Sequence, residues 1–174
     1  MKFTIQTNYT ARRMVTMARV LRKTVRKKHS RRSHLFGWII LLCAGAVSVR
    51  HLIKGDAMDT SQLLVWIAFV LLLVTLLWED QINGYLAYKR MMAGTETNTT
   101  DFLPEQYVTT TAVGTTTWHY DKILLIAETK DAFVFVFDKR YAQIYDKQTL
   151  QGGDVEEFRK FLSRATQKDI LKVS

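Results

Sequence analysis

Two long apolar segments lie close together in the first half of the chain, directly after a stretch rich in Lys and Arg. The first runs from Leu35 to Ile53 and the second over about residues 61–80. At about 1.5 Å of rise per residue, the nineteen residues of the first segment make a helix of about 28 Å, close to the thickness of a bilayer's hydrocarbon core. We therefore expect a transmembrane hairpin with these two spans. The alternative is a pair of buried core helices, but a chain of 174 residues has little other apolar sequence to cover them.

The positive charge of the chain is concentrated in its first 34 residues. The whole chain has 25 Lys and Arg, 16 Asp and Glu, and a formal net charge of +9. Eleven basic residues and no acidic ones precede residue 35, so the remainder has fourteen basic and sixteen acidic residues and a net charge of −2. Because basic residues beside a span hold that side in the cytoplasm, we expect both ends of the chain to be cytoplasmic.

The first predicted domain, residues 1–34, divides into a strand and a basic helix. Phe3 to Tyr9 alternates apolar and polar residues, which is typical of a short strand or an extended arm. From Thr10 to about Lys28, apolar residues recur along one helical stripe: Met14, Met17, Ala18, Leu21 and Val25. The opposite face carries the cations that we predict to contact anionic lipid: Arg12, Arg19, Arg22, Lys23 and Arg26. In the alternative, the stripe packs on the cytoplasmic domain and the charges only set the topology.

The second predicted domain, residues 35–94, contains the hairpin and a short extension. After Trp78, the acidic pair Glu79-Asp80 is followed by apolar residues at helical spacing, so we expect the helix to continue into the cytoplasm as a stalk that ends at Gly94. The first span also contains small residues that allow close helix packing: Gly37, Ala44, Gly45, Ala46 and Ser48. They favour a contact with the second span, with another membrane protein as the alternative.

The third predicted domain, residues 95–174, has the pattern of a small β-rich domain that ends in a helix. Apolar and β-branched runs predict strands over residues 97–103, 107–111, 115–118, 123–128, 132–137 and 140–145. The run 132–137 is apolar on both faces, which predicts a central strand covered on each side. Asp154 and Glu157 form a capping-box pattern before an amphipathic helix. The sequence thus predicts an α+β protein with a pleckstrin-homology-like (PH-like) antiparallel barrel capped by a C-terminal helix.

An ordered set of motifs runs through this third domain. It comprises Trp118-His119-Tyr120-Asp121-Lys122-Ile123, Glu128-Thr129, the aromatic run 133–137 and Gly153-Asp154-Val155-Glu156-Glu157-Phe158. In these motifs, over about residues 97–165, the chain resembles the YcxB-like protein family, with Trp118, Asp121, Ile123, Glu128 and Phe158 as the matching positions. It departs from the family's pattern at residues 145–147. The resemblance implies a protein of the bacterial cytoplasmic membrane with a PH-like cytoplasmic domain, and it implies no catalytic residue.

The sequence predicts neither an enzyme nor a cofactor or metal site. The only cysteine, Cys43, lies in the first span, and no HExxH pair or cysteine cluster is present. Nucleic acid is not an expected partner because no aromatic residues are interleaved with the cations. We expect a membrane-anchored protein whose cytoplasmic domain mediates protein interaction or self-association. The alternatives are a membrane-surface sensor or immunity-type factor that acts through the basic helix on anionic lipid, and an accessory subunit of a transporter.

Overall fold

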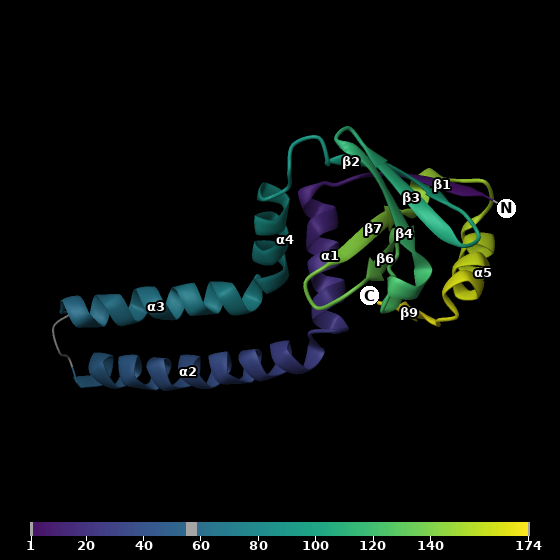
Figure 1. The fold of residues 1–174 in the computed structure, drawn as a ribbon. Helices are drawn as coiled ribbons and strands as arrows, with labels where there is room; N and C mark the ends of the chain where they lie inside the picture. The colour runs from purple at the N-terminus through teal and green to yellow at the C-terminus, as the bar shows by residue number, and fades with distance from the viewer. Residues whose placement is uncertain (1, 55–58, 174) are drawn as a thin grey trace.

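The computed structural model describes residues 2–54 and 59–173 of the chain. A long helical hairpin projects from an α+β domain, and the segments before and after the hairpin both enter that domain (Figure 1). The hairpin consists of α2 (Lys27–Lys54) and α3 (Thr60–Leu77). Over residues 27–50 and 60–77, these helices are long and apolar enough to cross a membrane. Only 17% and 6% of their most apolar stretches are buried, so the rest of the chain does not cover them as it would cover core helices.

The two hairpin helices pack antiparallel through small residues of α2. A Cβ atom added at Gly37 would lie 2.7 Å from Leu76, and one at Gly45 would lie 3.6 Å from Phe69. Ser48 is fully buried on the same side of α2. Gly37 and Gly45 therefore serve the contact between α2 and α3, as expected for a contact between the two apolar segments.

The remaining elements form two sheets and three further helices. The five-stranded sheet has the order β4 (Gly114–His119), β3 (Gln106–Thr111), β2 (Thr97–Phe102), β1 (Phe3–Asn8) and β8 (Leu150–Gln151). The four-stranded sheet has the order β7 (Ala142–Asp146), β6 (Ala132–Val136), β5 (Leu125–Glu128) and β9 (Ile170–Lys172). The helices are α1 (Ala11–Lys23), α4 (Glu79–Lys89) and α5 (Val155–Thr166), and two short 3-10 turns lie at Tyr120–Lys122 and Lys147–Thr149.

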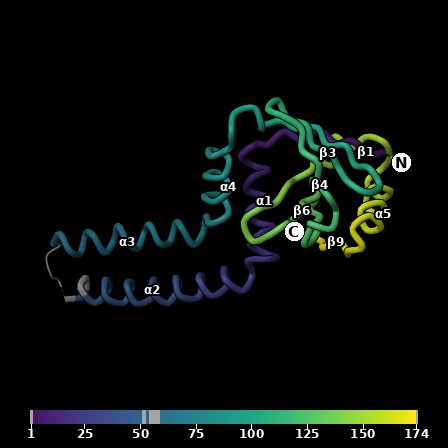
Figure 2. The backbone as a smooth tube through the Cα atoms, viewed as in Figure 1, coloured from purple at the N-terminus to yellow at the C-terminus, as the bar shows by residue number. Residues whose placement is uncertain are grey.

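The N-terminal strand β1 lies inside the five-stranded sheet, although the hairpin separates it from its neighbours in sequence. It pairs antiparallel with β2, where Phe3 is opposite Phe102, and with β8 on its other side. Phe3 and Ile5 are fully buried in the core. Figure 2 shows the same path, with the purple N-terminal segment entering the sheet beside the green strands. The strand expected at the start of the chain is confirmed, and its position joins residues 1–34 to residues 95–174 in one folded unit.

The central strand expected from the apolar run is confirmed as β6, which is buried along its whole length between β5 and β7. One face contributes Phe133 and Phe135 to an aromatic core that α5 covers with Phe158 and Leu162. The other face contributes residues to a smaller core completed by α1: Ala132, Val134 and Val136, with Val20 and Leu21 from the helix. The expected capping box of α5 is also present, because Asp154 accepts from the Glu157 N–H at 2.7 Å and the Glu157 carboxylate accepts from the Asp154 N–H at 3.1 Å.

Two features of the domain differ from the sequence prediction. The described strand pairs form two sheets rather than one closed antiparallel barrel, and β5 pairs in parallel with β9. The parallel pair arises because the chain returns after α5 alongside β5 as a further short strand. The second apolar helix also does not continue unbroken as the expected stalk, because α3 ends at Leu77 and Trp78 (φ −115°, ψ 26°) is non-helical. Helix α4 then turns away from the hairpin to lie beside α1 (Figure 1).

Candidate functional site

The five cations predicted to contact lipid lie on or just after α1, but they do not form one free basic face. Asp80 of α4 accepts two hydrogen bonds from Arg22, each of 2.7 Å, and lies 3.6 Å from Arg19. The contact with Asp80 raises the pKa of Arg22. Arg26 donates to the backbone carbonyl of Lys139 in the β6–β7 turn at 2.5 Å. The side chains of Arg12 and Lys23 are exposed.

The apolar stripe of α1 is occupied by the domain. Met14 and Leu21 are buried, and Met17 and Val25 pack against the smaller core. The structure thus follows the alternative in which the stripe packs on the domain. Contact of the five cations with lipid stays a prediction, and it would have to occur without insertion of this stripe.

Helices α1 and α4 make an unusually close contact, and it fixes the hairpin on the domain. A Cβ atom on Gly84 of α4 would lie 2.5 Å from the backbone N and Cα atoms of Val15 in α1. Only glycine fits such an approach, because real Cβ atoms do not come so near a backbone. With the Arg22–Asp80 pair at the other end, the contact holds α1 and α4 together along most of their lengths.

A polar junction lies where the hairpin meets the domain. Glu79, the first residue of α4, accepts from the hydroxyl of Ser30 at 3.2 Å, and its carboxylate lies 2.6 Å from Nε2 of His34. Both partners belong to the first two turns of α2. The acidic pair that the sequence places after the second span therefore binds residues that precede the first span, through Glu79 to α2 and through Asp80 to α1.

A basic pocket of about 560 Å³ opens at the same junction, and we call it the hairpin-base pocket. The last turn of α1, the first two turns of α2 and strand β9 line it through Arg22, Lys23, Lys27, Ser30, Arg31, His34, Lys172 and Val173. Five of these eight residues are Lys or Arg, one is His, and none is acidic. The helical pattern of the sequence predicted the cations of α1 as candidate site residues. No local pattern predicted that Lys172 would line the same pocket.

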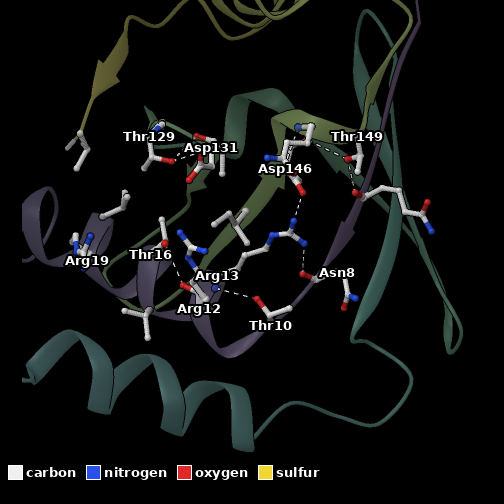
Figure 3. A pocket seen from close by; sticks show the side chains of 18 of the residues that line it. Asn8, Thr10, Arg12, Arg13, Thr16, Arg19, Thr129, Asp131, Asp146 and Thr149 are labelled. Carbon is white, nitrogen blue, oxygen red and sulfur yellow. Dashed lines mark hydrogen bonds and ion pairs between the residues drawn. The ribbon is translucent and has the colours of Figure 1, made fainter.

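A larger polar cleft of about 1180 Å³ lies between α1, strand β1 and the turns of the four-stranded sheet (Figure 3). At its centre, Arg13 donates to the carboxylate of Asp146 and to the backbone carbonyl of Asn8. The other oxygen of Asp146 accepts from the Gln148 N–H at 3.0 Å. This buried carboxylate ties α1 to β7, so its role is to hold the N-terminal segment on the domain. Asp146 also belongs to the segment in which the chain departs from the pattern of the family named above.

The five positions that carried the family resemblance have structural roles. Phe158 and Ile123 are buried in the aromatic core, and Trp118 packs against it. Asp121 is exposed and lies 3.0 Å from Lys122, and this contact lowers its pKa. Glu128 is buried and has the most elaborate set of contacts among the five.

Glu128 joins three elements through two cations. Its carboxylate accepts two bonds from Arg159 of α5, at 2.8 and 2.9 Å, and one from Lys147 at 2.7 Å. The bond with Arg159 is the main reason that the pKa of Glu128 falls from an ordinary value of 4.5 to about 2. The same contact raises the pKa of Arg159. Lys147 also lies 5.0 Å from the centre of the Phe133 ring, so the cluster packs directly on the core.

Strand β4 is an open edge of the five-stranded sheet. Its sequence, Gly-Thr-Thr-Thr-Trp-His, contains no Lys, Asp, Glu or Pro, and its side chains are exposed except for Trp118. Natural proteins commonly protect an edge strand with such residues. Trp118 lies 5.8 Å from Tyr141 and 5.2 Å from Phe137 between ring centres, and Tyr141 is 44% exposed. The edge thus ends beside a partly exposed aromatic cluster.

Among the described residues, no group of three or more His, Cys, Asp or Glu side chains is placed to hold a metal ion. His119, the last residue of β4, and Asp121, in the 3-10 turn that follows, are both exposed.

Comparison with known proteins relates part of the chain to a described family. Residues 102–162 match the family model described as YcxB-like protein, in the C-terminal part of the chain. The resemblance predicted from the sequence is therefore confirmed over this segment. The matched segment begins at the end of β2 and ends within α5, so it includes neither β1 nor the hairpin. No curated protein and no solved structure matches the chain.

Proposed function

We propose that this chain is a non-enzymatic, membrane-anchored protein whose cytoplasmic, PH-like domain associates with another protein through the open edge of β4. We propose that a second copy of the chain is the partner that binds this edge. The observation that carries the proposal is an unprotected strand of six residues at the end of an otherwise well-paired sheet.

Membrane anchorage is supported by the exposed apolar surface of the hairpin. Large side chains on both helices are uncovered, among them Leu42 at 71% and Leu71 at 62% exposure. Because β1 and β2 pair directly, both ends of the hairpin lie on the same side of any membrane that it spans. The positive charge of residues 1–34 favours the cytoplasm for that side. Resistance of the chain to alkaline extraction from membranes tests the anchorage.

The backbone geometry of β4 supports strand addition. A two-residue turn closes the β3–β4 hairpin on the pair Thr111 and Gly114. In an antiparallel ladder, alternate residues direct their N–H and C=O groups to the neighbour. Gly114 and Thr116 therefore bond β3, whereas Thr115 and Thr117 present their backbone groups at the open edge. A partner strand can pair with these groups.

A second copy suits this edge because the strand is self-complementary. Antiparallel pairing centred on Thr116 places Thr115 of one copy opposite Thr117 of the other, without like charges in the strand. The same register places Trp118 across from Gly114, and an aromatic residue commonly covers an edge glycine in this way. Anchorage in one membrane also holds two copies with their domains at the same level.

Cross-linking of the full chain in membranes tests this proposal. In a Cys43→Ser background, Thr116→Cys should give a disulfide-linked dimer, because residues at this central position face each other at short distance. Thr110→Cys on β3 is the matched control and should give none. A monomer by light scattering in mild detergent, together with equal cross-linking of the two cysteine variants, would contradict self-association.

Backbone substitution gives an independent test. Thr117→Pro removes an outward N–H without removing a bond to β3 and should abolish the dimer. Thr117→Val retains that N–H and should leave the dimer intact. Near-ultraviolet circular dichroism checks that each variant keeps its aromatic core.

Neither alternative interpretation has comparable support. The sensor alternative relied on an α1 stripe that packs on the domain, and the transporter alternative relied on small residues that pack within the hairpin.

A further inference from the structure

The hairpin-base pocket carries uncompensated positive charge. Arg22 is neutralised by Asp80, but Lys27, Arg31 and Lys172 form no ion pair within the described part of the chain. Glu79 and Asp80 do not line the pocket. Lys27, Arg31 and Lys172 therefore repel one another, and an anion that binds in the pocket relieves this repulsion.

The position of the pocket matches the headgroup layer of a membrane that contains the hairpin. Its α2 residues run from Lys27 to His34, which is about 10 Å along a helix axis. His34 directly precedes Leu35, the first residue of the apolar span. The polar layer on each side of a bilayer is about 5–8 Å thick. The pocket therefore opens at the depth where lipid phosphates lie.

The presence of Lys172 in the pocket is not explained by membrane orientation alone. Basic residues beside a span are expected from the positive-inside rule, and Lys27 and Arg31 satisfy it. Lys172 belongs to β9, which the parallel pairing with β5 carries back to the base of the hairpin. The pocket thus combines cations from both ends of the chain in one cavity.

We propose that the hairpin-base pocket binds the phosphate group of an anionic phospholipid, with Lys27, Arg31 and Lys172 as its phosphate contacts. This inference rests on the membrane anchorage proposed above. The three side chains line one cavity, although they come from α2 and β9. Free phosphate shares the chemistry of the headgroup, so the test separates the two sources.

The experiment measures lipid retention by the full chain in detergent micelles. Native mass spectrometry compares micelles that contain phosphatidylglycerol with micelles that contain phosphatidylcholine of the same acyl chains. The wild type should retain phosphatidylglycerol preferentially. Each direct charged contact with the phosphate contributes about tenfold in affinity. The double variant Lys27→Gln/Arg31→Gln should therefore lower the affinity for phosphatidylglycerol about a hundredfold, and Lys172→Gln alone should lower it about tenfold.

The matched control is Lys28→Gln with Arg32→Gln. These residues lie on the same two turns of α2 and carry the same charge, but they do not line the pocket. Their replacement should change lipid retention by about twofold or less. Equal losses in the two double variants, or an unchanged affinity in Lys172→Gln alone, would show diffuse surface attraction and overturn the proposal.

Two further measurements complete the test. Inorganic phosphate at millimolar concentration should not displace the bound phosphatidylglycerol, and full displacement would overturn the lipid assignment in favour of a soluble anion. Failure of the anchorage itself would appear separately, as wild-type chain in the soluble fraction, and that result would also overturn the lipid assignment.

Discussion

Replacement of Glu128 by Gln should destabilise the domain by about 3 kcal/mol at neutral pH. The carboxylate is 7% exposed and binds Arg159 and Lys147, and its pKa falls from 4.5 to about 2 on folding. At about 1.4 kcal/mol for each tenfold change in proton affinity, this difference corresponds to about 3 kcal/mol. Removal of one partner from a buried ion pair costs a similar amount.

The loss should depend on pH in a defined direction. Because the pKa of Glu128 is lower in the folded than in the unfolded chain, its stabilisation is complete above about pH 5.5 and is lost as the pH falls through 4.5 toward 2. The difference in unfolding free energy between wild type and Glu128→Gln should therefore shrink from about 3 kcal/mol at pH 7 to about 1 kcal/mol at pH 3.

Urea unfolding of the full chain in detergent, followed by near-ultraviolet circular dichroism, measures this difference. Glu156→Gln is the matched control, since Glu156 pairs with the same Arg159 but its side chain is 57% exposed. An exposed pair of this kind contributes about 0.5 kcal/mol or less. If the two variants lose the same stability, or if the loss from Glu128→Gln is as large at pH 3 as at pH 7, the reasoning is refuted.

Two further substitutions test the packing of the helices. Gly84→Ala should separate α1 from α4 and lower the unfolding free energy by about 1–3 kcal/mol, because the new Cβ atom would clash with the backbone of Val15. Gly45→Ala is the control in the same urea assay, since its new Cβ atom would make only an ordinary van der Waals contact with Phe69. Asp154→Ala should cost about 1 kcal/mol through loss of the α5 capping box, and an unchanged urea midpoint would show that the cap contributes nothing.

The parts of the fold that depend on local sequence could be predicted. The capping box at Asp154, the doubly apolar strand β6 and the two apolar helices each have a pattern within a few residues. The placement of β1 could not be predicted in the same way, because its pairing with β2 joins residues such as Thr4 and Asp101, which are 97 positions apart. An alternating strand shows which face is buried but not which neighbour it chooses.

The candidate sites were predictable only in part. The charge pattern identified the cations of α1. It could not show that Arg22 would form an ion pair with Asp80, or that Lys172 would line the hairpin-base pocket. The turn at Trp78 was missed because the residues after it continue a helical pattern, and only the contacts of Glu79 and Asp80 with preceding helices fix the change of direction. These contacts are tertiary, so periodicity contains no signal for them.

The position of β1 between β2 and β8 also constrains how the domain forms. During synthesis, residues 3–8 leave the ribosome before either of their partner strands, and they remain unpaired until both hairpin helices and then β2 have followed. If the hairpin spans a membrane, as proposed above, the domain cannot complete its sheet before both helices have been inserted. A chain that inserted only one helix would place β1 and β2 on opposite sides of the membrane and would leave Phe3 and Ile5 unburied. In a membrane-anchored chain, completion of the sheet would thus depend on insertion of both helices, because only a full hairpin returns the chain to β1.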